Sequence, residues 1–333
     1  VFQLHGGALR SSDDAIDRLS RFTRETLDHA SAEKIAPRHS EHEVVIMGAG
    51  MSGVCMAIQL QRAGVHDFVL LEKQPGLGGT WWDNTYPGAH VDMPAPAYAF
   101  SFAPHTRWTR RFASAPEIQR YMRALAERHG LIERIRFNTC LAEARFDDAT
   151  GQWHFTTTDG CRLRARFFVC STGPLNQPRW PDIPGLDEFR GEKLHSARWD
   201  ASIPLAGKRV AVVGTGSTAV QLIPPIAREA ARLHVFQRTA NWVLPRFERR
   251  YFWFDGLLAR FPPYAKAVRF AWVQFLELTR RGFQDGTLMR RFMLGLAARH
   301  CRRQVPDVEK RAALTPDYPL GCKRIIYAND YYP

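Results

Sequence analysis

The sequence has few cysteines, no paired cysteine motif and no long apolar run. Six cysteines occur among 333 residues, and none of them belongs to a C-x-x-C pair. This spacing excludes the usual zinc sites and redox dithiols, so we expect reduced thiols in a cytoplasmic protein without a metal centre. No apolar run is long enough to span a bilayer, and no signal peptide is visible at the N-terminus.

Acidic residues are also scarce, because 33 Asp and Glu stand against 46 Lys and Arg, which gives a formal net charge of +13. This excess indicates either attraction to anionic ligands or membrane surfaces, or simply a solvated surface that is rich in arginine. The solvated surface is the favoured interpretation. No basic run alternates with aromatic side chains in the way that a stacking platform requires. We therefore expect no nucleic-acid partner.

Glycine, by contrast, forms two dinucleotide-binding fingerprints. Gly48, Gly50 and Gly53 make the first; Gly214 and Gly216, followed by the small Ala219, make the second. The first position permits a tight turn, the second lets a pyrophosphate approach, and the third lets helix and strand pack closely. Each fingerprint follows an apolar run (43–48, 209–213) and precedes helix-like sequence and another run (68–71, 233–236). This context predicts an α/β fold with two Rossmann-like domains.

The residues that follow the second run of each unit carry opposite charges. Glu72, with Lys73 beside it, suits ribose hydroxyls and therefore FAD, whereas Arg238 and Thr239 suit the 2′-phosphate of NADPH. The phosphates of the second site are expected to contact the first turns of the following helix, at Ser217, Thr218 and Gln221. An ordinary surface arginine is the alternative interpretation of Arg238.

Composition changes along the chain suggest five segments. They are an N-terminal helical extension at 1–40, the first part of an FAD-binding domain at 41–175, a linker and NADP-binding domain at 176–244, a helical insertion at 245–314 and an incomplete return to the NADP-binding domain at 315–333. The insertion carries apolar residues at helical spacing, such as Phe270, Val273 and Leu276. A buried stripe is favoured over a membrane-binding face.

A glycine-rich turn at 76–79 comes directly before Trp81 and Trp82. Glycines in such density mark backbone that another group approaches closely, and two flat aromatic side chains suit an isoalloxazine ring. A glycine turn before two core tryptophans is the alternative.

Three further segments resemble the signatures of type I Baeyer–Villiger monooxygenases, which belong to the class B flavin-dependent monooxygenases. The linker segment 189–200 matches F-x-G-x-x-x-H-x-x-x-W-[PD], with Phe189, Gly191, His195, Trp199 and Asp200 at the fixed positions. The segment 79–92 is similar to G-G-x-W-x-x-x-x-Y-P-G-x-x-x-D, and 321–324 is similar to the short run that contains the family's active-site arginine. The match covers 43–245 well and resumes at about 313–333.

The resemblance implies roles for individual residues. Gly79, Thr80, Trp81, Tyr98 and the strand near Leu141 would border the FAD, and Lys323 would approach the NADP ribose and its 2′-phosphate. Arg324 would stabilise an anionic peroxyflavin, oriented by Asp92 through a charge-assisted pair. His195 and Trp199 would couple domain motion to catalysis.

The implied reaction uses FAD, NADPH and O₂ to insert one oxygen atom beside a ketone carbonyl, through a C4a-peroxyflavin, to give an ester or lactone. A related flavin-containing monooxygenase that oxygenates nitrogen or sulfur is the nearest alternative, and Trp199-Asp200 favours the Baeyer–Villiger side. A third interpretation is a catalytically incomplete fragment of such an enzyme, because relatives continue well past the Lys323-Arg324 motif.

Overall fold

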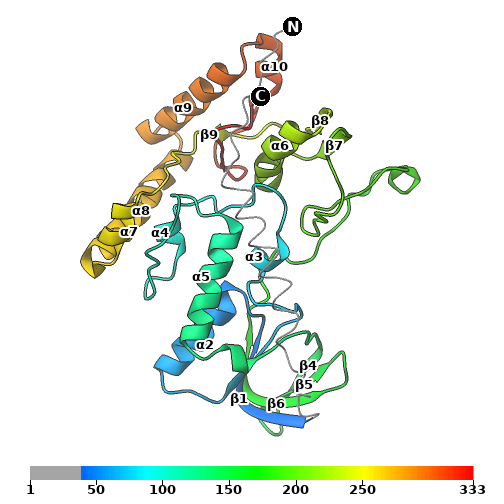
Figure 1. Cartoon of the computed structure of the whole chain (residues 1–333), viewed down its shortest axis with the longest axis vertical. Coiled ribbons are helices and arrows are strands. Elements are labelled where there is room, and N and C mark those ends of the chain that lie inside the picture. The colour runs from blue at the N-terminus through cyan, green and yellow to red at the C-terminus, as the bar shows by residue number, and fades with distance from the viewer. Residues whose placement is uncertain (1–38, 333) are drawn as a thin grey trace.

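The computed structural model describes residues 39–332. The helical extension predicted at 1–40 therefore lies outside the described residues, apart from His39 and Ser40, which begin the first strand. Two α/β units follow one another along the chain, with a group of helices beside them (Figure 1). The predicted α/β class with two Rossmann-like units is confirmed.

The first unit is built on a six-stranded sheet of order β3-β2-β1-β6-β5-β4. Parallel strands form one side, and two antiparallel strands extend the other. The strands are β1 (His39–Met47), β2 (Phe68–Leu71), β3 (Ile135–Arg136), β4 (Leu141–Asp147), β5 (Gln152–Thr157) and β6 (Arg162–Cys170). The observed β2 matches its predicted run. The antiparallel part of the sheet begins at Leu141, where β4 pairs along β5.

Alternation along the strands gives this sheet two buried faces. Val44 and Ile46 of β1 point to the face that is covered by α2 (Met51–Arg62) and α5 (Ala115–Arg128), where the largest apolar core lies. Val45 points to the other face and packs with Phe155 of β5 and Leu163 of β6. Burial on both faces explains the uninterrupted apolar run of β1.

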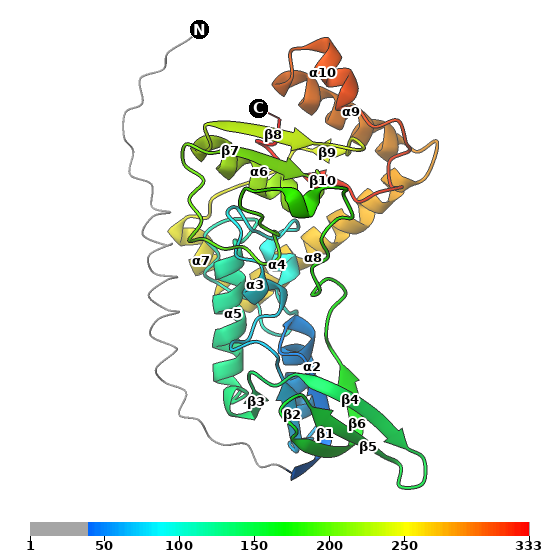
Figure 2. The same cartoon turned by 90° about the vertical axis from the view of Figure 1, so that its right-hand side faces the viewer.

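The second unit consists of α6 (Ser217–Glu229) between two parallel strands, β7 (Arg209–Val213) and β8 (Arg232–Phe236). The observed bounds of both strands lie within one residue of the predicted runs. A separate parallel pair, β9 (Val243–Leu244) and β10 (Ile326–Tyr327), brings the end of the described chain back beside this unit (Figure 2). The return of the chain at β10 places residues 321–324 next to the first unit's loops.

Four α-helices follow the second unit: α7 (Trp253–Ala259), α8 (Pro262–Thr279), α9 (Leu288–Gln304) and α10 (Val308–Ala313), with a 3-10 turn η3 (Arg280–Phe283). Although they follow the second unit in sequence, α8 packs on the short helix α4 (Ala95–Tyr98) of the first unit. Arg269 of α8 donates to the carbonyl oxygens of Pro96 at 3.1 Å and Ala97 at 2.8 Å. Within residues 39–332, no helix combines the length and apolarity that a membrane crossing needs.

Candidate functional site

The first glycine fingerprint forms the predicted turn between β1 and α2. Gly48 has φ +101°, and a Cβ at Gly53 would lie 1.9 Å from the Gly48 carbonyl oxygen, so both positions require glycine. Helix α2 has neither a capping side chain nor an acidic residue in its first turn. Its N-terminal N–H groups and the positive end of its dipole therefore suit an anionic ligand.

Glu72 follows β2 and lies against this turn. Its side chain is buried, with 5% exposure, and Oε2 accepts a hydrogen bond from the Ala49 N–H at 2.7 Å while Oε1 accepts from the Gln74 N–H at 2.9 Å. Each carboxylate oxygen keeps a further lone pair. The fold thus fixes this carboxylate beside the fingerprint, where the ribose of a bound dinucleotide is expected.

The second fingerprint forms a more open turn. Gly214 has φ +105°, and a Cβ at Gly214 or Gly216 would meet no atom within 4 Å. Helix α6 also lacks a capping side chain and first-turn acidic residues, in contrast to α9 and α10, which are capped by Thr287 and Asp307. The Gly214 N–H donates to the Phe236 carbonyl at 2.9 Å, which joins the turn to the strand that leads to Arg238 and Thr239.

Trp81 and Tyr98, two predicted flavin neighbours, contact each other. The Trp81 Nε1–H donates to the Tyr98 hydroxyl at 2.8 Å, and the two rings lie edge to face with centroids 5.6 Å apart. Burial raises the pKa of Tyr98. Trp81 lies in the single-turn helix α3 (Thr80–Asp83) and packs, partly buried, against the large core of the first unit. The Thr80 carbonyl accepts a bond from the Asn84 side-chain amide.

The glycine-rich turn at 76–79 is approached by protein atoms. A Cβ at Gly76 would lie 2.2 Å from the ring of Trp82, and one at Gly79 would lie 2.9 Å from the Gly50 Cα. The Gly78 N–H donates to the Ala49 carbonyl at 3.1 Å. Trp82 and the first fingerprint therefore leave no room for a side chain at Gly76 and Gly79. The expected approach of a flavin to this turn stays a prediction.

Asp92 and Arg324 form an ion pair although 232 residues separate them in sequence. The distance from Arg324 Nη2 to Asp92 Oδ2 is 2.5 Å, and the side chains are 67% and 31% exposed. Arg324 opens onto a pocket of about 350 Å³ that is lined by Phe283, Gly321, Cys322, Lys323, Arg324, Ile325 and Tyr327. The two predicted catalytic residues are thus brought together at a cavity.

Sequence reasoning missed two aromatic residues of this pocket, Phe283 and Tyr327. A Cβ at Gly321 would lie 2.6 Å from the Phe283 ring, so Phe283 packs directly on the loop before Arg324. Burial, and then the charge of Asp92, raises the pKa of Tyr327. The position of Tyr327, three residues beyond Arg324, was a usable signal, whereas Phe283 comes from a distant helical segment. Lys323 lies 4.6 Å above the ring of Tyr318.

The linker signature is folded mainly on itself. The Phe189 ring packs on Gly191, and the His195 Nδ1 accepts from the Ala197 N–H at 3.1 Å. The His195 ring lies edge to face with Trp180, at a centroid distance of 5.5 Å. Further along, Trp199 packs against the core of the second unit, and Asp200 accepts bonds from Ser202, which lower the pKa of its carboxyl.

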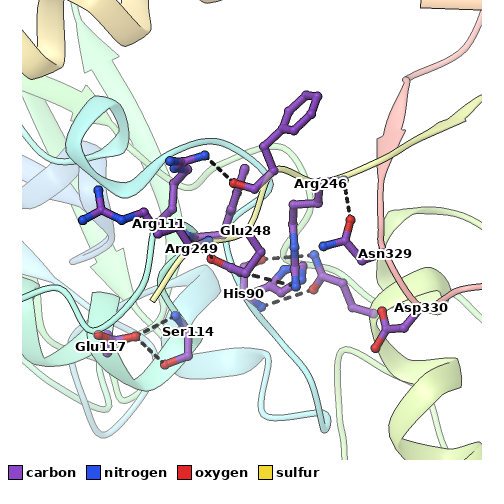
Figure 3. A network of polar contacts seen from close by, with 12 residues as sticks. His90, Arg111, Ser114, Glu117, Arg246, Glu248, Arg249, Asn329 and Asp330 are labelled. Atoms are coloured by element: carbon purple, nitrogen blue, oxygen red, sulfur yellow. Dashed lines mark hydrogen bonds and ion pairs between the residues drawn. The ribbon is translucent and has the colours of Figure 1, made fainter. Parts of the chain in front are cut away.

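A polar network that the sequence did not suggest lies between the two units (Figure 3). His90 is buried, and desolvation, followed by the charges of Arg246 and Arg110, lowers its pKa to about 3. Arg246 forms an ion pair with Glu248 at 3.4 Å, and its backbone N–H donates to the Asn329 side chain at 2.8 Å. These contacts tie Arg246, whose charge acts on His90, to the end of the described chain.

Gln221, Lys73 and Leu141 are the remaining residues that the sequence predicted to contact a cofactor. Gln221, expected at the coenzyme phosphates, directs its amide toward the loop that contains Tyr86 and His90. Leu141 begins β4 and packs against the smaller core of the first sheet, and Lys73 lies near Asp83. In the described part of the chain, no group of three or more His, Cys, Asp or Glu side chains is placed to hold a metal ion.

The geometry agrees with comparison to known proteins. Residues 41–269 match the model of the flavin-binding monooxygenase-like family. The chain belongs to this family. It is 40% identical over 296 residues to a Baeyer–Villiger monooxygenase of Streptomyces coelicolor, and 39% identical over 305 residues to one of Pseudomonas aeruginosa. These alignments cover 89% and 90% of the chain but 57% and 56% of the two relatives, so the chain spans somewhat more than half of their length.

Solved structures show the same similarity. A steroid monooxygenase bound to NADP superposes with a TM-score of 0.78 at 30% identity, over 88% of this chain and 63% of that one. The structure named OTEMO, in complex with FAD and NADP, also gives 0.78 at 30% identity, over 87% and 62%. Solved structures in complex with NADP, and in one case with FAD as well, therefore share the fold described here.

Proposed function

We propose that this chain carries the FAD- and NADPH-binding parts of a Baeyer–Villiger monooxygenase, which inserts one oxygen atom of O₂ beside a ketone carbonyl to give an ester or lactone. The observation that carries the proposal is the ion pair between Asp92 of the first unit and Arg324, which lines a pocket near the end of the described chain. The similarity of about 40% to two Baeyer–Villiger monooxygenases supports it.

The residues present suit both cofactors. The uncapped helix α2, the turn around Gly48 and Gly50, and the carboxylate of Glu72 would hold the dinucleotide part of FAD, and Trp81 and Tyr98 would border its ring system. The open turn at Gly214 and Gly216 and the uncapped helix α6 would hold NADPH, with Arg238 at the 2′-phosphate. When bound, the pair supplies hydride transfer and activation of O₂.

Arg324 would supply a permanent positive charge at the pocket. Negative charge develops on oxygen atoms during this reaction, and a guanidinium cannot lose its proton at any ordinary pH. Asp92 holds the guanidinium by a charge-assisted bond, so little reorganisation is needed when negative charge appears. The protein thereby contributes orientation and electrostatic stabilisation at the pocket.

The test uses the purified protein reconstituted with FAD and supplied with NADPH, O₂ and a panel of ketones and thioethers, with products identified by mass spectrometry. We expect esters or lactones from the wild type, and a loss of about 100-fold or more in Arg324→Ala, the range for removing one donor to a developing oxyanion. Arg324→Lys should recover only part of it, because a lysine lacks the planar fork.

The control is Arg228→Ala, which breaks a similarly exposed ion pair with Asp330 on the second unit. Both exposed pairs contribute about 1 kcal/mol or less to stability, so neither variant should unfold measurably earlier. Sulfoxides without esters would replace the proposed reaction by heteroatom oxygenation. Equal activity in Arg324→Ala and Arg228→Ala would remove Arg324 from the mechanism.

A further inference from the structure

Gln221 links the second unit to the first through its side chain. It lies near the start of α6, five residues after Gly216, and all three of its side-chain hydrogen bonds cross to the first unit. Its Oε1 accepts from the Tyr86 hydroxyl at 2.9 Å and from the His90 N–H at 3.2 Å, and its Nε2 donates to the His90 carbonyl at 3.1 Å. The Gln221 amide thus makes two hydrogen bonds to the His90 backbone and one to the Tyr86 hydroxyl.

The loop that Gln221 holds also packs on α6. Tyr86 is buried among the core residues of the second unit, together with Val220 and Ile223 of α6. At Gly88, which has φ +83°, an added Cβ would lie 2.4 Å from the Gln221 carbonyl oxygen, so the loop backbone runs directly against the helix. The contact between the loop and α6 is therefore both polar and close-packed.

Two residues beyond His90, the same loop carries Asp92. Between them, the Val91 side chain is buried in the first unit's core, and its N–H donates to the Ala113 carbonyl at 3.0 Å. The loop 86–92 therefore has Gln221 at one end and the Asp92–Arg324 pair at the other. No segment longer than two residues separates the two contacts.

We propose that Gln221 is a positioning residue that couples coenzyme binding at the second glycine fingerprint to the placement of Asp92 and hence of Arg324. The inference rests on the proposed function, since it takes NADPH as the ligand of α6. A pyrophosphate at the N-terminus of α6 orders the first turns of that helix. Gln221 transmits this order to the loop 86–92, and a coupling of this kind acts in both directions between the two sites.

Only an amide meets both requirements of the site. Glutamate offers no donor to the His90 carbonyl, and leucine offers neither donor nor acceptor while filling nearly the same volume. Gln221→Leu therefore removes the bonds and leaves the packing. Tyr86→Phe is a milder second variant, because it removes one of the three bonds and keeps the buried ring.

The test is amide hydrogen exchange, measured by mass spectrometry on peptides that cover 86–92, without ligand and with saturating NADP⁺. We expect NADP⁺ to slow exchange of the wild-type loop about tenfold, which corresponds to one net hydrogen bond. In Gln221→Leu the loop should exchange faster than wild type without ligand, and NADP⁺ should no longer slow it. The dissociation constant of NADP⁺, measured by calorimetry, should stay within about threefold of wild type, because the phosphate contacts at the N-terminus of α6 remain. Tyr86→Phe should lie between the two.

Gln61→Leu is the matched control, since Gln61 of α2 donates to the His129 carbonyl within the first unit. It should behave as wild type in the loop 86–92. Persistent slowing by NADP⁺ in Gln221→Leu, or the same loss in Gln61→Leu, overturns the coupling. A wild-type protein that binds no NADP⁺ overturns the proposed coenzyme as well, whereas a protein that binds NADP⁺ without any effect on the loop overturns the coupling alone.

Discussion

The two glycine fingerprints open units that bury their second strands to very different extents. Leu71, the last residue of β2, is 1% exposed, whereas Phe236, the last residue of β8, is 58% exposed. β2 lies between β3 and β1 in a six-stranded sheet, while β8 pairs only with β7 within the described residues. The local turn therefore forms in both settings, and the burial of the strand that follows depends on its neighbours.

The largest expected difference between the units concerns these two strand ends. Leu71→Ala leaves a cavity in the first sheet and should cost about 3 kcal/mol of unfolding free energy, within the usual range for buried leucine. Phe236→Ala removes an exposed ring and should change stability by about 0.5 kcal/mol or less. Denaturant unfolding of both variants measures the difference, and a large loss in Phe236→Ala would show that this face is covered in solution.

The third position of the fingerprint gives the next contrast. The second fingerprint has alanine at its third position, Ala219, whereas the first has Gly53. In Gly53→Ala the new Cβ would lie 1.9 Å from the Gly48 carbonyl oxygen. The turn must shift, at a cost of about 2–3 kcal/mol, and FAD retention should fall with it. The reverse change, Ala219→Gly in α6, should cost about 1 kcal/mol from helix propensity alone. Equal losses in the two variants, measured by thermal unfolding, would mean that the two turns are equally tight.

His90 lies where the units meet, and its titration gives a third measurement. Burial, together with the charges of Arg246 and Arg110, lowers the pKa of His90 to about 3. As the pH falls below about 6.5, His90 therefore becomes protonated in the unfolded chain but stays neutral in the folded protein. Stability should therefore drop by about 2 kcal/mol between pH 7 and pH 5 and continue to fall toward pH 3. Other side chains also titrate in this pH range, so the contribution of His90 to the loss of stability has to be separated from theirs.

The variant His90→Gln isolates the contribution of His90, because the difference from wild type should shrink as pH falls. His234→Gln, on the exposed strand β8, is the control for the substitution of a histidine by glutamine. A parallel shift of the His90→Gln and wild-type curves at every pH would contradict the buried neutral histidine.

Local patterns allowed much of the fold to be predicted from the sequence. Apolar runs next to glycine turns predicted β2 and β7 to within a residue, since each strand is specified by a few adjacent side chains. The strand expected near Leu141 is β4, but its extent could not be predicted, because none of its residues is fully buried and its alternation is weak. The placement of α8 on the first unit depends on Arg269 reaching the carbonyls of Pro96 and Ala97, which no local pattern reveals.

The candidate site divides in the same way. The family motif suggested that Asp92 and Arg324 act as a pair, and the fold brings them together across 232 residues. Gln221 was expected at a phosphate because of its place on α6, yet its amide bonds to Tyr86 and His90 of the other unit. A side chain's place in a motif indicates which helix it sits on, but its partner depends on the tertiary packing of a second segment.

The smallest expected effect concerns the choice between NADPH and NADH. The residue that follows the second strand is the acidic Glu72 in the first unit and the basic Arg238 in the second. Arg238→Ala should raise the KM for NADPH about tenfold and leave that for NADH nearly unchanged, because one charge-assisted contact to the 2′-phosphate is lost. Glu72→Gln should instead weaken FAD retention, since the buried carboxylate also accepts from the Ala49 N–H. Initial rates with the two coenzymes and flavin absorbance after dialysis measure the two effects. Loss of NADPH preference in Glu72→Gln, or loss of FAD in Arg238→Ala, would reverse the assignment of the units.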